Sequence, residues 1–148
     1  RKNTTGKREL GCRFVSISYL KIYMGPEAKL YQKVKRKTPN IIWNRIENLS
    51  VPGMPDALCY NKNKLFFTVE FKIAKGNFVR FSPHQIAWHH THPENTFIIV
   101  EAHGPRSNKL VHLFRGSRIL ELEACGLTLG AWRLGLEACC LELDAFGA

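Results

Sequence analysis

Hydrophobic and polar residues alternate most regularly in residues 65–73, Leu-Phe-Phe-Thr-Val-Glu-Phe-Lys-Ile. Every second residue from Leu65 to Ile73 is apolar, which is the period of a β-strand with one buried face. A shorter apolar run ends at Tyr60, and the polar residues 61–64 between the two runs are typical of a hairpin turn. This part of the chain is therefore predicted to form an antiparallel β-hairpin.

One helix is predicted before this hairpin and one after it. The first begins at Gly25-Pro26 and runs to about Lys37, because proline is tolerated in the first turn of a helix and Thr38-Pro39 stops it. The second begins at Ser82, where Ser82-x-x-Gln85 forms a capping box. Phe81 and Ile86, on either side of this start, have the spacing of a hydrophobic staple.

Further strands are expected to complete a sheet. They are predicted at residues 14–23, 41–49, 96–101 and 109–114. Helices and strands in this order are typical of a mixed α/β or α+β domain. We therefore expect a mixed β-sheet flanked by helices, formed by residues 24–118.

The composition differs at the two ends of the chain. Residues 1–23 begin with a basic, polar arm and are expected to be an N-terminal extension. Residues 119–148 are acidic and rich in Leu and Ala, and we expect a helix that is buried in its own core or against a partner. One face of this helix would carry Leu127, Ala131, Leu134, Ala138 and Leu141. A homodimer interface and core packing both explain such a face.

The charge of the chain indicates a polyanionic partner. There are 22 Lys and Arg against 12 Asp and Glu, which gives a net charge of +10. Residues 1–118 hold 21 of the basic and 7 of the acidic side chains, so the excess is concentrated there. Such a surface attracts nucleic acid, although solubilising charge alone would give the same composition.

The five cysteines form no Cys-x-x-Cys pair, which argues against the common zinc and redox motifs. Their odd number and the absence of a secretory segment predict a reducing, intracellular (cytoplasmic) setting. No run of about 18 uncharged apolar residues occurs, so no membrane partner is expected.

Glu70 and Lys72 share one face of the second hairpin strand, about 7 Å apart along it. A pair of this kind is commonly an ordinary surface salt bridge. Asp56, at the start of the preceding strand, gives the pair another meaning if it lies opposite Glu70. A three-residue loop, residues 62–64, brings Asp56 opposite Glu70, whereas a four-residue loop, residues 61–64, turns Asp56 to the other face.

Two carboxylates and a lysine at one point are suited to phosphodiester hydrolysis. Asp56 and Glu70 are hard oxygen ligands for Mg²⁺, for which Mn²⁺ is expected to substitute, and the backbone carbonyl of Phe71 is a candidate third ligand. The ion stabilises charge on the phosphate and lowers the pKa of a bound water. Lys72 would orient or deprotonate that water, or neutralise the transition state.

The ordered set of motifs resembles the PD-(D/E)xK nuclease superfamily, and in particular its VRR-NUC branch. The resemblance extends over about residues 27–113 and rests on Gly53-x-Pro55-Asp56, Glu70-x-Lys72 and Gln85. It implies a restriction-endonuclease-like fold with an αβββαβ core. It also implies divalent-metal-dependent cleavage of branched, flapped or other DNA, as in Holliday-junction resolvases, and several members of the family are homodimers.

The resemblance implies that Asp56 and Glu70 are metal ligands, that Lys72 is the catalytic lysine and that Gln85 supports the active site. Gln85 has a second explanation, because the capping box alone accounts for it. Members of the family often have a glutamate near the start of the first helix, and Glu27 stands at the matching place. A carboxylate there also suits the positive end of the helix dipole.

Several basic side chains are interpreted as contacts to the nucleic-acid backbone: Lys29, Lys33, Arg36, Lys37, Arg45, Lys75 and Arg80. Arg45 and Glu47 share a strand face, from which they could reach the metal or a phosphate, or pair with each other. The histidines within residues 84–92 are interpreted as exposed helix residues or phosphate contacts. Trp43 and Trp88 are interpreted as core residues.

We therefore predict a Mg²⁺-dependent DNA endonuclease or structure-selective nuclease, with branched DNA among its expected substrates. Two alternatives stay open at this level. One is a nucleic-acid-binding module in which Asp56, Glu70 and Lys72 are only structural. The other is a ribonuclease of the same fold, because the metal site would attack either phosphodiester.

Overall fold

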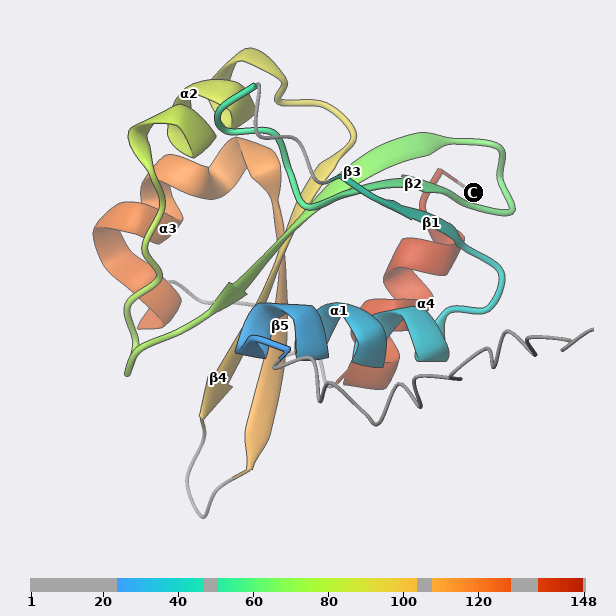
Figure 1. Cartoon of the computed structure of the whole chain (residues 1–148). Coiled ribbons are helices and arrows are strands. Elements are labelled where there is room, and N and C mark those ends of the chain that lie inside the picture. The colour runs from blue at the N-terminus through green and yellow to red at the C-terminus, as the bar shows by residue number, and fades with distance from the viewer. Residues whose placement is uncertain (1–23, 47–50, 104–107, 129–135, 148) are drawn as a thin grey trace, which may run out of the picture.

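Five strands form one mixed sheet with helices on both of its faces (Figure 1). The structure is a computed structural model that describes residues 24–46, 51–103, 108–128 and 136–147. Along the chain lie α1 (Pro26–Lys37), β1 (Ile42–Arg45), β2 (Ala57–Tyr60), β3 (Phe66–Ile73), α2 (Pro83–Thr91), β4 (Thr96–His103) and β5 (Lys109–Arg115). They are followed by η2 (Gly116–Arg118), α3 (Ile119–Cys125), η3 (Gly126–Thr128) and α4 (Leu136–Ala145). The predicted mixed sheet flanked by helices is confirmed.

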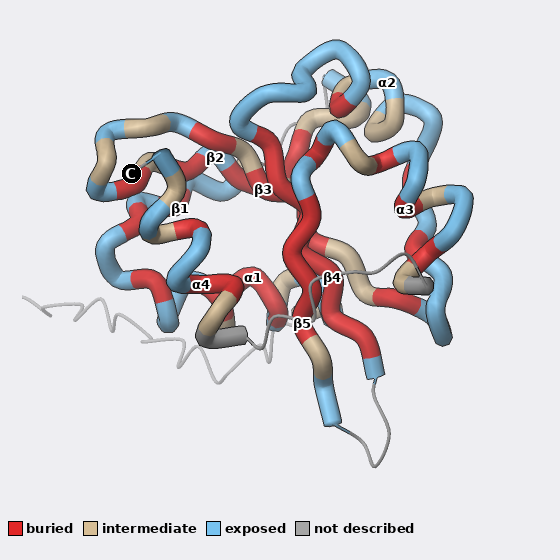
Figure 2. Tube along the Cα trace, turned by 180° about the vertical axis from the view of Figure 1, so that it is seen from behind, coloured by how far each residue is buried: buried red, intermediate tan, exposed pale blue. Residues whose placement is uncertain are grey.

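The strands lie side by side in the order β1-β2-β3-β4-β5. Neighbouring strands are antiparallel except β3 and β4, which are parallel. A parallel pair needs a crossover connection, and α2 supplies it. The sheet is most deeply buried along β3, β4 and β5, which form the buried band at the centre of Figure 2.

Helices α1 and α4 cover one face of the sheet. α1 buries Leu30, Tyr31 and Val34, whose spacing places them on one side of the helix. They pack against apolar side chains of β1, β2 and β3, and Cys139 and Leu143 of α4 extend the same cluster. The described part of the C-terminal segment therefore belongs to the same core as the sheet.

Helices α2 and α3 lie on the opposite face. Ile98 and Val100 of β4 pack there with Ile119 and Leu122 of α3. Phe81 belongs to the same cluster and the partly buried Ile86 packs against it. The two residues predicted as a hydrophobic staple therefore contact one core at the start of α2.

The described residues depart from the single apolar helix face predicted for residues 127–141, of which Ala131 and Leu134 lie outside the described part of the chain. Gly126 has a positive φ of 58° and follows the last residue of α3, so the first helix ends there. The second helix, α4, buries Cys139, Cys140 and Leu143, whereas Leu141 is 69% exposed. Cys139, Cys140 and Leu143 pack within the chain, so core packing accounts for these three residues, and the homodimer stays a prediction.

Two further predictions reach outside the described residues. The strand expected at residues 14–23 lies there entirely. The strand expected at residues 41–49 is described only as β1, and Glu47, beyond its end, is not described.

Candidate active site

The β2–β3 hairpin brings the candidate site together. The backbone N–H of Asn61 donates to the Leu65 carbonyl at 3.2 Å, so the loop consists of residues 62–64. The pairing of β2 with β3 keeps this register as far as Ala57 and Val69. Continuing it by one residue places Asp56 opposite Glu70. The three-residue loop is therefore the one the protein adopts, and the four-residue alternative is excluded.

The side chain of Asn61 explains this choice of loop. Its Oδ1 accepts the backbone N–H groups of Asn63 at 3.0 Å and Leu65 at 3.2 Å. Lys64 adopts a left-handed conformation with a φ of 61°. Asn61 is only 2% exposed, so these hydrogen bonds are sheltered from water. A residue distant from the carboxylates therefore fixes the register that brings them together.

Asp56 lies immediately before β2, which begins at Ala57. In an antiparallel pair of strands, every second residue directs both its N–H and its C=O toward the partner strand. Asn61 and Leu65 form such a hydrogen-bonded pair, and counting in steps of two along β3 from Leu65 reaches Phe71. The residue opposite Phe71 would be Pro55, which lies outside β2. The Phe71 N–H is accepted instead by Asp56 Oδ2 at 2.7 Å. By the same alternation the Phe71 carbonyl is expected to be directed toward the side of Asp56, and its place among the metal ligands stays a prediction.

Glu70, Lys72 and Gln85 are joined to one another by hydrogen bonds and an ion pair. Lys72 Nζ lies 3.2 Å from Glu70 Oε1 and donates to Gln85 Oε1 at 3.1 Å. Gln85 Nε2 donates in turn to Glu70 Oε1. The ammonium also lies 5.5 Å from the ring centre of Phe81, where a cation–π contact holds it. An ammonium has three N–H donors, so one is left for a further acceptor.

Glu70 is 1% exposed, and its Oε2 has no hydrogen-bond partner among the described residues. Burial and then the neighbouring Asp56 carboxylate raise the pKa of Glu70 to about 8, against the opposing effect of Lys72. Burial also raises the pKa of Asp56, although its bond to Phe71 N–H opposes the shift. Two crowded carboxylates, one with an orphaned buried oxygen, favour the binding of a cation.

Gln85 serves the helix cap and the site together. Its backbone N–H donates to Ser82 Oγ at 3.2 Å, and its Oε1 accepts the Ser82 N–H at 3.0 Å, which completes the predicted capping box. Because Oε1 accepts from both Ser82 and Lys72, the amide is oriented with Nε2 toward Glu70. The two explanations of Gln85 are therefore compatible.

Gly53 packs the turn before Asp56 against the start of α2. It has a φ of 85°, a conformation that side chains disfavour. A Cβ on Gly53 would clash with the backbone carbonyl of His84. A glycine at this point therefore lets the turn carrying Asp56 approach the helix that carries Gln85.

Glu27 lies near the carboxylates from the side of α1. With Asp56 and Phe71 it lines a cavity of about 30 Å³, together with Tyr31 and Arg45. Burial raises the pKa of Glu27, Lys72 opposes this shift and Asp56 adds to it. The Arg45 guanidinium lies 5.6 Å from the ring centre of Tyr31. Tyr31 was not singled out from the sequence, although it follows Glu27 by one helical turn.

The predicted nucleic-acid contacts lie in different surroundings. Arg45 and Lys75 line a hollow of about 420 Å³ beside Glu27. Lys33 pairs with the buried Glu101 at 3.4 Å, so its contact to nucleic acid would compete with this ion pair. The other predicted contacts are exposed: Lys29 in the first half of α1, Arg36 and Lys37 in its last turn, and Arg80 before α2.

The prediction that the histidines of α2 are exposed is wrong for His89. Its side chain is fully buried, and neither ring nitrogen has a hydrogen-bond partner among the described residues. Gly116 allows this packing, because a Cβ there would clash with Thr96 Oγ1 and His89 Nδ1. Trp43 is 7% exposed and belongs to the core as predicted, whereas Trp88 is partly buried and stacks on His92.

The donor set at the site fits a hard divalent cation. Asp56 and Glu70 offer carboxylate oxygens, Phe71 offers its carbonyl, and the orphaned Glu70 Oε2 requires a partner. Within the described ranges, no group of three or more His, Cys, Asp and Glu side chains is arranged to hold a metal ion. A cation held here would have two carboxylates and a backbone oxygen as its candidate ligands.

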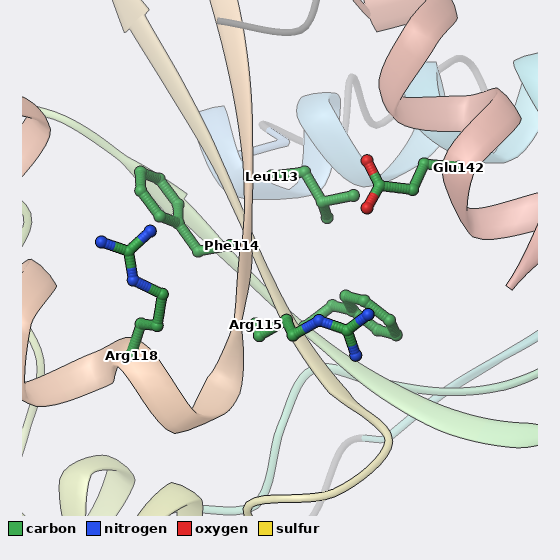
Figure 3. Close-up of a pocket in the computed structure, with 6 residues that line it drawn as sticks. Leu113, Phe114, Arg115, Arg118 and Glu142 are labelled. Carbon is green, nitrogen blue, oxygen red and sulfur yellow. The ribbon is translucent and has the colours of Figure 1, made fainter. Parts of the chain in front are cut away.

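Another cavity, of about 320 Å³, lies between β5, η2 and α4 (Figure 3). Arg115, Arg118 and Glu142 contribute its charged groups, and Arg118 is already paired with Glu121 at 2.9 Å. Its lining contains one carboxylate, so it lacks the paired acids of the β2–β3 site.

Comparisons with protein-family models, with curated proteins and with solved structures found no match. None of the helices in the described ranges is both long and apolar enough to cross a membrane.

Proposed function

We propose that the chain is a divalent-metal-dependent nuclease that hydrolyses phosphodiester bonds of DNA. The observation that carries the proposal is the meeting of Asp56, Glu70 and Lys72 at the point where β2 leaves β3. An ordinary salt bridge between Glu70 and Lys72 would satisfy both Glu70 oxygens or leave them in water. Here one buried carboxylate oxygen has no partner within the described ranges and lies beside a second carboxylate.

Asp56, Glu70 and the Phe71 carbonyl are the groups that would hold Mg²⁺ or Mn²⁺. Such a cation, when bound, acts as a Lewis acid on the phosphate and lowers the pKa of bound water. Glu27 stands next to Asp56 and would add negative charge to the same cavity. A cavity of about 30 Å³ has room for two or three water-sized groups, at roughly 10–15 Å³ each.

Lys72 would supply positive charge where the reacting phosphate gains negative charge. Gln85 Oε1, Glu70 Oε1 and the Phe81 ring fix the ammonium, and its remaining N–H is available to a water or to a phosphate oxygen. A preoriented donor of this kind costs no reorganisation during the reaction. Gln85 is a positioning residue, because it acts on the reaction through Lys72 and Glu70.

DNA is the proposed substrate because the chain is basic and two cations, Arg45 and Lys75, lie beside the carboxylates. A structure-selective nuclease acting on branched DNA is the finer form of this proposal. The assay that tests both is incubation of labelled single strand, duplex, flap and four-way junction with Mg²⁺, Mn²⁺ or EDTA. The same assay with matched RNA strands tests the alternative that the protein is a ribonuclease.

We expect cleavage that requires the metal and that is lost, by at least a hundredfold, in Asp56→Asn and in Lys72→Ala. Both variants should still bind DNA, because phosphate contacts elsewhere dominate affinity. Glu94→Gln is the matched control, because it removes an exposed carboxylate outside the site. Absence of metal-dependent cleavage by the wild type would leave the binding-module alternative, and full activity of Asp56→Asn would mean that the site is elsewhere.

A further inference from the structure

We infer that the substrate strand approaches the carboxylates from the α1 side of the sheet, and that Arg45 and Lys75 bind the phosphate next to the one that is cleaved. The inference rests on the proposed function and adds to it a binding subsite and a direction of approach. It is carried by two neighbouring hollows on one side of the site and by the packing that closes the other side.

The small cavity at Asp56 adjoins a larger hollow, with which it shares two lining residues. Glu27 and Arg45 line both the 30 Å³ cavity and the 420 Å³ hollow, so the two are contiguous. The larger one continues past Ile73 to Lys75. Ile73 is two residues beyond Phe71 along β3, which is about 7 Å. The hollow therefore leads away from the candidate metal ligands along the end of β3.

Approach from the α2 side is blocked in the described part of the chain. The turn before Asp56 packs on α2, because Gly53 lies against the backbone of His84. Phe81 and Gln85 cover Lys72, whose side chain is 14% exposed. Glu70 beneath them is 1% exposed. A phosphodiester strand, which is bulky and hydrated, would have to displace the start of α2 to enter there.

The charges of the larger hollow suit a phosphate. Arg45 lines the hollow and lies 5.6 Å from the ring centre of Tyr31, and a guanidinium is suited to bidentate contact with phosphate oxygens. Lys75 is exposed, and no ion pair joins it to another described residue, unlike Lys33 or Lys62. A cation without a protein partner loses no existing ion pair when it binds phosphate.

The groove on the other face provides the competing path. It has a volume of about 210 Å³ and is lined by apolar residues that include Leu58, Phe66 and Trp88. Phe66 is 59% exposed there, and a base could stack on it. This groove has one acidic residue, Glu94, and no lysine or arginine in its lining, so it offers little to a phosphate backbone.

The test is DNA binding measured by fluorescence anisotropy between 50 and 200 mM salt in EDTA, where cleavage does not interfere. We expect Lys75→Ala to lower the salt slope of log Kd by about one, so that affinity falls about fourfold less over this range. Lys64→Asn, which removes one charge at the hairpin tip and retains a residue that tolerates positive φ, should keep the wild-type slope. Arg45→Gln should weaken binding at least as much as Lys75→Ala.

Cleavage kinetics of the same variants separate the subsite from the chemistry. Lys75→Ala should raise KM several-fold with kcat nearly unchanged, because the residue holds a phosphate that does not react. A wild-type slope in Lys75→Ala, an equal change in Lys64→Asn, or a larger loss of affinity in Phe66→Ser would overturn the inferred approach. These slopes are measured without metal, so they stand apart from failure of the proposed function, which appears as wild-type protein that binds DNA and does not cleave it.

Discussion

At the scale of single residues, Glu70 shows how one carboxylate is held ready for a cation. Its Oε1 is satisfied by Lys72 and Gln85, whereas its Oε2 is buried without a partner among the described residues. Removing a carboxylate from water is costly unless a charge or a hydrogen bond compensates for it. Lys72 and Gln85 compensate for the burial of Oε1, and a bound cation would compensate for the burial of Oε2.

The double role of Gln85 can be separated by two substitutions. Ser82→Ala removes the hydroxyl that caps α2 and leaves Gln85 bound to Lys72 and Glu70, so it should cost about 1 kcal/mol in the free energy of unfolding and little activity. Gln85→Ala removes the side-chain half of the capping box together with the site contacts, while the backbone N–H of residue 85 can still donate to Ser82 Oγ. We expect a similar or larger loss of stability and a fall in kcat of at least tenfold.

Urea unfolding and single-turnover cleavage measure the two effects. In Gln85→Ala the pH profile of cleavage should also change, because Lys72 and Glu70 lose a shared partner. Equal losses of kcat in Ser82→Ala and Gln85→Ala would show that Gln85 contributes only as a cap.

At the scale of elements, α2 connects the core to the site. Its first turn presents Gln85 to β3, and its last turn buries His89 against Thr96 of β4 and Gly116 of η2. Burial, followed by the positive charges of His92 and Lys72, lowers the pKa of His89 to about 4. The ring is therefore neutral in the folded protein throughout the physiological range.

This burial predicts a loss of stability in mild acid. The pKa of His89 is lower in the folded protein than the ordinary value of 6.5, so the unfolded chain binds more protons between pH 6.5 and pH 4. Stability contributed by the neutral ring is present above pH 6.5 and is lost as the pH falls toward 4, at no more than about 1.4 kcal/mol per pH unit. His89→Gln, which cannot titrate, should flatten this part of the curve.

Chemical denaturation at a series of pH values provides the comparison. His90→Gln, on the exposed side of the same helix, is the matched control and should keep the wild-type pH dependence. If His89→Gln lost stability between pH 6.5 and pH 4 as steeply as the wild type, other groups would be responsible.

At the scale of the whole molecule, two layers of helices place groups from both faces of the sheet around one gap. Glu27 comes from α1 on one face and Gln85 from α2 on the other, while Asp56 and Glu70 come from the sheet itself. The hairpin loop also reaches the C-terminal segment, since Asn61 Nδ2 donates to the carbonyl of Phe146 at 2.8 Å. The hairpin that sets Asp56 opposite Glu70 is therefore also in contact with the C-terminal segment.

Binding of a divalent cation should consequently stabilise the entire fold, because the site does not exist in the unfolded chain. We expect Mn²⁺ at a hundred times its Kd to add about 2.7 kcal/mol to the free energy of unfolding. At one fixed Mn²⁺ concentration the gain should be larger at pH 8.5 than at pH 6, because the pKa of Glu70 is raised to about 8 and the ligand must lose its proton to bind.

Thermal unfolding with and without Mn²⁺ at the two pH values tests this expectation. Glu70→Gln should abolish the gain, and Glu94→Gln should retain it. An equal gain in Glu70→Gln would show that Mn²⁺ binds elsewhere on the protein.

The sequence by itself determined where most helices and strands form and which side chains of β3 share a face. Alternation places Glu70 and Lys72 on one side of a strand whatever the rest of the chain does, and Ser82 with Gln85 starts a helix through local hydrogen bonds. The same local patterns predicted the mixed sheet flanked by helices, which is confirmed. The ends of β1 and β4 and the break between α3 and α4 differed, because element ends depend on tertiary contacts.

Only the tertiary structure decided which groups meet. The loop of residues 62–64 is selected by Asn61, whose side chain bonds both the turn and the C-terminal segment. The burial of His89 and the ion pair of Lys33 with Glu101 depend on packing between elements far apart in the chain. A period of two or 3.6 residues reports which way a side chain points, whereas its partners are set by distances that no local pattern contains.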